Sequence, residues 1–271
     1  MADAVFEDKR LAEIYDPLDP DRGDLDLYIN LTEEFHCRSV LDIGCGTGTL
    51  ACLLAERGID VTALDPAAAS LDVARDKAYA DRVEWVLGGV ASLPPLKVDL
   101  VTMTGNVAQV FLTDYEWSST LKAAAAALRP GGLLVFETRD PARRDWEEWN
   151  RGQTFKRTVL PNVGEVETWV DLAHVNLPFV SFRWTFVFMS DRTASTSDST
   201  LRFWERAEMT NSLVRHGFTV DDIRDAPDRP GREFVFVARR VNEDPVFLRR
   251  GSYPEPAYGA PPEKSMQSSA N

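Results

Sequence analysis

The chain has 271 residues, 44% of them hydrophobic, which is enough for a sizeable core and is not typical of a disordered protein. Its formal net charge of −13 and its pI of about 4.8 argue against nucleic acid or an anionic membrane surface as a partner. The odd number of cysteines (Cys37, Cys45 and Cys52), with no Cys-x-x-Cys pair, predicts reduced thiols and a cytoplasmic protein.

The N-terminal region, residues 1–36, is predicted to form a helical cap. Its first residues contain neither a basic segment nor an apolar segment of the kind found in signal peptides, so we expect no signal peptide. No apolar run in the chain approaches the roughly 20 residues that span a bilayer, so we expect no membrane partner. Two helices should be separated at residues 16–21, because Pro17 and Pro20 do not fit inside a helix. Tyr15, just before this break, could contact a bound molecule through its ring and hydroxyl, or could be an ordinary packing residue.

A glycine-rich turn follows the first predicted strand. Residues 39–43 form a short apolar run, Gly44, Gly46 and Gly48 alternate directly after it, and a helix is predicted over residues 49–57. Glycine allows positive φ and lets a ligand approach the backbone closely. The first amide groups of the helix then suit a carboxylate, a ribose or a phosphate.

This stretch, with Asp42 near the end of its strand, resembles motif I of the class I S-adenosylmethionine-dependent methyltransferases. The dehydrogenase fingerprint G-x-G-x-x-G is not met, because Thr49 stands where its third glycine should be. The resemblance implies S-adenosylmethionine as the cofactor and S-adenosylhomocysteine as its product. It also implies an α/β fold with a doubly wound, mostly parallel seven-stranded sheet of the Rossmann-like kind.

The second strand, residues 60–65, ends on an acid. Asp65 occupies the position at which enzymes of this family carry an acid that binds the two ribose hydroxyls of the adenosine. One carboxylate can accept both hydrogen bonds. The alternative is an acid that caps the next helix, predicted over residues 67–79, with Pro66 in its first turn.

The turn after the third strand departs from the family pattern. Residues 83–87 form the strand, and Gly89 stands where related enzymes usually carry an aspartate for the adenine amino group. Adenine recognition should therefore rely on backbone groups around Val90 and Ala91.

The fourth strand, residues 98–103, should end at the site, since ligands bind at the carboxyl ends of parallel strands. Asn106 and Gln109 are expected to face it. No Asn/Asp-Pro-Pro-Tyr sequence follows, which counts against methylation of DNA bases within this family.

The next part of the chain matches the usual element order of the family: a helix over residues 117–128, a Pro-Gly-Gly turn and a strand over residues 133–138. Arg139 follows at the carboxyl edge of the sheet. Residues 151–204 then alternate polar and apolar side chains, which predicts about four antiparallel strands forming a lid. Trp146 and Trp149, just before this insertion, could pack in its core or line a pocket.

The α/β pattern then resumes with a helix over 205–216 and strands over 218–223 and 233–238. The hairpin between these strands carries Arg229 and should lie near the substrate. The predicted domains are the cap at 1–36, the Rossmann-like domain at 37–150 and 205–242, the lid at 151–204, and a flexible tail at 243–271 that takes no part in the chemistry.

The resemblance and the strand-end argument give two sets of predicted site residues. Cofactor-binding residues are Tyr15, Asp42, Gly44, Cys45, Gly46, Gly48, Thr49, Leu50, Asp65, Pro66, Gly89, Val90, Ala91, Thr104, Gly105 and Asn106. Substrate-binding residues are Asn106, Gln109, Arg139, Trp146, Trp149 and Arg229.

No catalytic residue and no metal site can be assigned from the sequence. His36 lies at the wrong edge of the sheet, His216 ends a helix, and His174 is expected on a strand surface. The expected reaction is methyl transfer to an amine or hydroxyl of a small molecule, Asp140 being a possible base for a hydroxyl. The alternatives are a non-catalytic cofactor-binding regulatory module and, less favoured by the glycine spacing, a nicotinamide-dependent oxidoreductase. A monomer or homodimer is expected.

Overall fold

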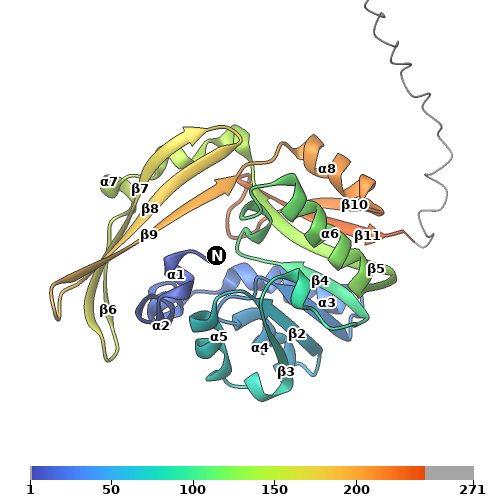
Figure 1. Cartoon of the computed structure of the whole chain (residues 1–271), viewed down its shortest axis with the longest axis horizontal. Helices are drawn as coiled ribbons and strands as arrows, with labels where there is room; N and C mark the ends of the chain where they lie inside the picture. The colour runs from blue at the N-terminus through green and yellow to red at the C-terminus, as the bar shows by residue number, and fades with distance from the viewer. Residues whose placement is uncertain (1, 242–271) are drawn as a thin grey trace, which may run out of the picture.

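The computed structural model describes residues 2–241 and shows two sheets joined through helices and loops (Figure 1). The first sheet has seven strands in the order β10-β11-β5-β4-β1-β2-β3. Its strands are β1 Ser39–Ile43, β2 Asp60–Asp65, β3 Val83–Leu87, β4 Val98–Met103, β5 Leu128–Arg139, β10 Phe218–Asp225 and β11 Glu233–Arg240. The strands from β3 to β5 run parallel, while β11 pairs antiparallel with both β5 and β10. The predicted fold class is confirmed. The predicted tail lies outside the described residues.

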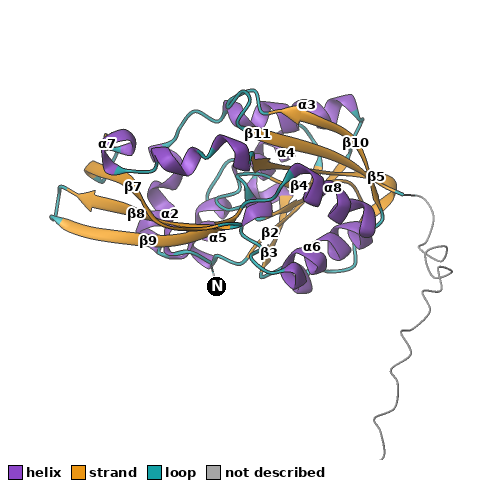
Figure 2. Ribbon diagram, turned by 90° about the horizontal axis from the view of Figure 1, so that it is seen from above, coloured by secondary structure: helices purple, strands orange, loops and turns teal. Residues whose placement is uncertain are grey.

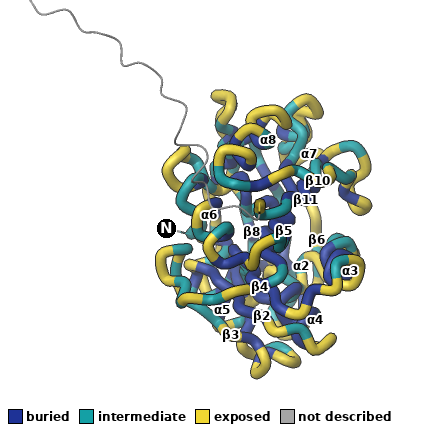
Figure 3. The backbone as a smooth tube through the Cα atoms, turned by 90° about the vertical axis from the view of Figure 1, so that its right-hand side faces the viewer, coloured by how far each residue is buried: buried dark blue, intermediate teal, exposed yellow. Residues whose placement is uncertain are grey.

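Helices cover both faces of this sheet. On one face, α3 (Asp26–Glu34) and α4 (Thr49–Glu56) pack through Leu31 and Leu54 onto Val135 and its neighbours. On the other face, α6 (Asp114–Ala127) and α8 (Arg206–Arg215) pack on Phe136 and Phe236, whose rings stack 5.2 Å apart. Burial is therefore deepest along the strands, and the outer turns of the helices are exposed (Figure 3). Both faces being covered explains why the central strands are almost continuously apolar.

The second sheet is antiparallel and extends away from the first (Figure 2). Its strands are β6 Lys156–Leu160, β7 Gly164–Asn176, β8 Phe179–Phe188 and β9 Thr193–Arg202. One end packs on the N-terminal helices α1 (Ala4–Glu7) and α2 (Lys9–Leu18), with Ile14 and Phe188 in the shared core. The expected insertion of about four antiparallel strands is thus present, and it covers the N-terminal helices.

The remaining helices are short. They are α5 Ala68–Arg75, α7 Arg151–Thr154 and the 3-10 turns η1 Gly23–Leu25, η2 Ala80–Arg82, η3 Val90–Ser92, η4 Val107–Gln109, η5 Pro141–Arg143 and η6 Asp145–Glu148.

Several predicted boundaries are wrong. Helix α2 does not break at residue 16. It includes Pro17 in its last turn and ends at Leu18. Helix α5 stops at Arg75, and Tyr79 adopts a left-handed φ of 65°. Helix α6 begins at Asp114, before the predicted start, because Thr113 and Glu116 form a capping box. The predicted Pro-Gly-Gly turn is an irregularity within the longer strand β5, where the register with β4 shifts.

We predict that Trp117→Ala lowers the free energy of unfolding by about 3–5 kcal/mol, the range for a buried aromatic truncated in a core. The indole of Trp117 is 2% exposed and lies 5.6 Å from the ring of Phe136. Tyr115, on the same helix, is 81% exposed, so Tyr115→Ala should change stability by no more than about 0.5 kcal/mol. Urea unfolding of both variants measures this; similar losses would mean that α6 does not pack as described.

Candidate functional site

The glycine turn between β1 and α4 has positive φ at all three glycines, 74° at Gly44, 53° at Gly46 and 75° at Gly48. A Cβ at Gly44 would come within 2.5 Å of the Val107 side chain, and one at Gly48 within 2.5 Å of Trp85. Packing therefore requires glycine at these two positions. A Cβ at Gly46 would meet nothing within 4 Å, so the surface of the turn is open there.

Two further glycines border open space at the same edge of the sheet. A Cβ at Gly89, after β3, or at Gly105, after β4, would also meet nothing within 4 Å. Together with Gly46 they give three stretches of backbone that a ligand can approach without meeting a side chain. We call these three residues the glycine cradle.

Asp65 ties the glycine turn to the start of the next helix. Its Oδ2 accepts from the backbone N–H of Gly46 at 2.8 Å, and its Oδ1 accepts from that of Ala67 at 2.8 Å. The side chain is 7% exposed, and burial raises the pKa of its carboxyl. Because each oxygen uses one lone pair, each can still accept one hydroxyl hydrogen. The helix-capping alternative and the ribose-binding alternative are therefore compatible.

Asp42 lies deeper, beneath the turn. Its Oδ1 accepts from the Thr102 hydroxyl at 2.8 Å, and its Oδ2 has no partner among the described residues. Burial raises the pKa of Asp42 to about 7. Its place inside the core, 1% exposed, fits support of the turn from below better than direct contact with a ligand.

Helix α2 is fastened to the glycine turn by polar side chains. Asp16 Oδ1 accepts from the hydroxyl of Thr47 at 2.7 Å, and Lys77 Nζ donates to Asp16 Oδ2 and to the Thr49 hydroxyl. Tyr15, the neighbour of Asp16, is 39% exposed with its ring 5.5 Å from that of Phe6. The sequence analysis missed Asp16 and Lys77, because only the fold brings them together.

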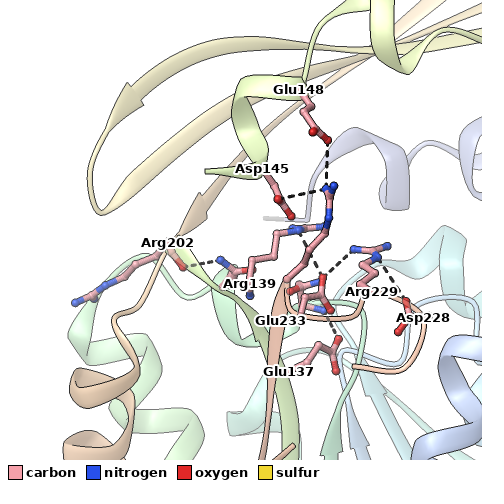
Figure 4. Close-up of polar contacts among 11 residues, drawn as sticks. Glu137, Arg139, Asp145, Glu148, Arg202, Asp228, Arg229 and Glu233 are labelled. Carbon is pink, nitrogen blue, oxygen red and sulfur yellow. Dashed lines mark hydrogen bonds and ion pairs between the residues drawn. The ribbon is translucent and has the colours of Figure 1, made fainter. Parts of the chain in front are cut away.

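A second polar cluster lies at the ends of β5 and β11, next to the loop after β4 (Figure 4). Glu137 Oε1 accepts from the backbone N–H of Asn106 at 2.6 Å. Glu233 Oε1 accepts from Asn106 Nδ2 at 3.2 Å and from Arg229 at 2.8 Å, and Arg139 Nε lies 3.7 Å away. Both glutamates are 5% exposed. The sequence analysis named Asn106, Arg139 and Arg229 but missed the two acids that bring them together.

This cluster borders a cavity of about 50 Å³. The lining residues come from η1, α3, the loop after β4, β5, the hairpin between β10 and β11, and β11. They include Asp24, Tyr28, Gly105, Asn106, Glu137, Asp228, Arg229 and Glu233. Gly105 belongs both to this lining and to the glycine cradle, so the two features adjoin.

Two of the side chains predicted to bind substrate are buried in the structure. Gln109 is fully buried, and its amide donates to the carbonyl of Arg202 and accepts from the backbone N–H of Arg139. Trp146 is 2% exposed, with its ring 4.6 Å from that of Phe203. Both side chains hold the second sheet against the first and do not line the cavity. Trp149 is half-buried, with the guanidinium of Arg139 5.6 Å from its ring centre.

The other predicted cofactor residues lie where the sequence pattern puts them, along the turns after β1, β2, β3 and β4. These are Cys45, Thr49, Leu50, Pro66, Val90, Ala91 and Thr104. Leu50 is buried, whereas Pro66 and Ala91 are exposed.

His174 and His216 lie on other elements, and Asp140, which follows β5 at this edge, has one oxygen engaged in a turn. His174 is exposed on β7, and His216 is held by Ser118 and by the carbonyl of Ser212, on the α6 and α8 side. Asp140 Oδ1 caps the turn that begins at Pro141. Within residues 2–241, no group of three or more His, Cys, Asp or Glu side chains is arranged to hold a metal ion.

Comparisons with known proteins find similarity to methyltransferases. A model described as "Methyltransferase domain" matches residues 40–132. The chain is 34% identical over 147 residues to the cypemycin N-terminal methyltransferase of Streptomyces sp, covering 52% of this chain and 60% of that protein. It is 34% identical over 122 residues to a ubiquinone biosynthesis O-methyltransferase of Idiomarina loihiensis, covering 43% and 49%. The chain thus matches about half of the length of these relatives.

Solved structures share the fold over almost the whole chain. The CcbJ methyltransferase of Streptomyces caelestis superposes with a TM-score of 0.72 at 22% identity, covering 89% of this chain and all of the other. CalS10, an amino pentose methyltransferase of Micromonospora echinaspora, superposes with a TM-score of 0.65 at 21% identity, covering 84% and 97%.

The buried cluster predicts a pH dependence of stability. Burial raises the pKa of Glu137 to about 8, with Glu233 adding to the rise and the Asn106 N–H opposing it. The folded state therefore holds this proton more tightly than the unfolded state, and its contribution to stability falls as the pH rises from about 4.5 through about 8. The free energy of unfolding of Glu137→Gln, relative to that of the wild type, should accordingly be higher at pH 8.5 than at pH 5.

Urea unfolding at the two pH values measures this difference. Glu148→Gln is the control, because the side chain of Glu148 is 59% exposed and is not desolvated in the folded state. An equal difference at both pH values for Glu137→Gln would contradict the assignment.

Proposed function

We propose that this chain, whose residues 40–132 match a methyltransferase-domain model, is a class I S-adenosylmethionine-dependent methyltransferase that transfers a methyl group to an amine or hydroxyl of a small molecule. The observation that carries the proposal is the glycine cradle beside Asp65, at the carboxyl edge of the parallel strands. Ligands of such sheets bind at this edge.

The residues present fit the cofactor. Open space above Gly46, Gly89 and Gly105 allows close approach of a ligand to the backbone. Asp65 keeps one lone pair on each oxygen for two ribose hydroxyls. When bound, S-adenosylmethionine supplies a methyl group on a sulfonium sulfur, which leaves as a neutral thioether when a nucleophile displaces it in line.

The chain's own part in this reaction is mainly positioning. Alignment of a nucleophile with the reacting carbon can supply on the order of 7–11 kcal/mol of a barrier. Asp65 would orient the adenosine, and Asp16 and Lys77 would keep α2 over the glycine turn. Asn106, Arg139, Trp149 and Arg229 would contact the acceptor. Gly89, in place of the usual aspartate, would leave the adenine to backbone groups.

The names of the relatives fit this acceptor class without choosing its atom. They include an N-terminal methyltransferase, an amino pentose methyltransferase and an O-methyltransferase. Cys37, Cys45 and Cys52 are free thiols, which supports a reducing compartment such as the cytoplasm. Among the described residues, no helix is long and apolar enough to cross a membrane.

A second function, a non-catalytic module that binds the same cofactor, is favoured by two specific observations. Gly89 stands where related enzymes usually carry an aspartate, and neither His174 nor His216 lies at the site. Release of S-adenosylhomocysteine separates the two functions, because only a catalyst forms it above background when amines and hydroxyls are supplied.

Calorimetric titration tests the proposed cofactor. S-adenosylmethionine and S-adenosylhomocysteine should each give saturable heat, whereas NAD should give none and should not raise the melting temperature. Absence of heat from both sulfur compounds at high micromolar concentration would refute the proposal.

Two glycines provide a matched test of the cradle. Gly46 and Gly58 have φ of 53° and 77°, and an added Cβ at either would meet nothing within 4 Å. Alanine at either should cost about 1–2 kcal/mol of stability, because both positions are left-handed. Only Gly46→Ala should weaken S-adenosylhomocysteine binding, by about tenfold or more, since Gly58 lies at the far end of α4. Equal affinity in the two variants would remove the glycine turn from the site.

A further inference from the structure

The cavity beside the glycine cradle contains an unusual set of unpaired polar atoms. Among the described residues, six buried side-chain nitrogen or oxygen atoms lack a hydrogen-bond partner. Three of them, Tyr28 Oη, Asn106 Oδ1 and Glu137 Oε2, belong to residues that line this one cavity. Buried polar atoms without partners are costly, so their concentration at one place indicates a site for a ligand.

The unpaired atoms specify the chemistry of that ligand. Above about pH 8, where Glu137 is ionised, its carboxylate and the amide oxygen of Asn106 can only accept hydrogen bonds, and a tyrosine hydroxyl can accept one. Three acceptors call for a group with several donor hydrogens. A protonated primary amine has three donor hydrogens and no acceptor, whereas a hydroxyl has only one donor hydrogen.

The charge of the lining favours a cation. Asp24, Glu137, Asp228 and Glu233 contribute carboxylates, and Arg229 is the cation of the lining. Arg229 is already committed, with one of its nitrogens 2.8 Å from Glu233. Glu137 contacts none of the arginines by hydrogen bond or ion pair within the described residues, so once it is ionised no arginine balances its charge.

We propose that this cavity binds the amine of the methyl acceptor, with Glu137 Oε2 receiving a proton from it. The proposal rests on the proposed function and assigns an amine, not a hydroxyl, as the acceptor. One N–H bond of the alkylammonium breaks and one O–H bond forms on Glu137, which leaves a neutral amine whose lone pair is free for the incoming methyl group. Glu137 has the burial required, since burial raises the pKa of a carboxyl and lowers that of an ammonium, bringing the two together.

The test measures binding of ethylammonium chloride to the full chain saturated with S-adenosylhomocysteine, at pH 8.5. Stabilisation against heat should follow ethylammonium concentration and exceed that given by ethanol or by sodium chloride at the same ionic strength. Glu137→Gln should raise the half-saturating concentration about tenfold or more, the effect of losing a hydrogen bond to a charged group. Glu148→Gln is the matched control and should behave as the wild type.

The outcomes are distinct. If S-adenosylhomocysteine itself does not stabilise the wild type, the proposed function fails. If it does, but ethylammonium adds no more than sodium chloride, or acts equally on the wild type and Glu137→Gln, the amine site is refuted and water alone fills the cavity. Should Glu137→Gln fail to fold, Tyr28→Phe removes one acceptor and keeps the ring, and it should weaken ethylammonium binding severalfold; an unchanged response would also refute the site.

Discussion

The carboxylate of Asp65 is the interaction on which the proposed site depends. It accepts backbone N–H groups from the glycine turn and from the start of α5, and so joins the ends of β1 and β2 into one rigid edge. The backbone N–H groups of Gly44 and Cys45 both donate to the carbonyl of Leu64, beside Asp65, and reinforce the join. A buried carboxylate with two charge-assisted bonds is a strong constraint. It constrains the turn that holds the three positive-φ glycines, and it leaves each oxygen able to accept one more hydrogen bond.

The rest of the architecture protects this edge and extends it. The second sheet supports α1 and α2 through an apolar core around Phe188, and α2 is fastened to the glycine turn through Asp16. On the other side, the hairpin between β10 and β11 supplies Arg229 and Glu233 to the cluster around Asn106. Two glutamates are buried at one strand edge. Glu233 is paired with Arg229, but Glu137 Oε2 has no partner, and burying an unpaired polar atom lowers the stability of the fold. Such a cost is typical of functional sites.

The sequence predicted the parts of the fold that depend on local patterns. Alternating glycines after an apolar run located the turn, and an acid ending the next strand located Asp65. The doubly wound, mostly parallel seven-stranded sheet followed from the family resemblance. Helix ends were less predictable, because Pro17 is tolerated in a last turn and a capping box at Thr113 extends α6 beyond its apolar pattern.

The cluster at the second polar site could not be predicted, since it depends on strands far apart in the sequence. Glu137 and Glu233 look like ordinary strand residues, and only the antiparallel pairing of β5 with β11 brings them to one edge. The burial of Gln109 and Trp146 could not be predicted either. Gln109 follows a strand end and Trp146 precedes the inserted sheet, but their partners, the Arg202 carbonyl and Phe203, come from the end of the second sheet and bury them.

A crystal structure of the full chain with S-adenosylhomocysteine tests the central claim most directly. The account predicts the ligand on the glycine turn, with both ribose hydroxyls on Asp65 and the adenine beside Gly89. Electron density for the ligand elsewhere, or an Asp65 that keeps only its two backbone contacts while the ligand is bound, would contradict it.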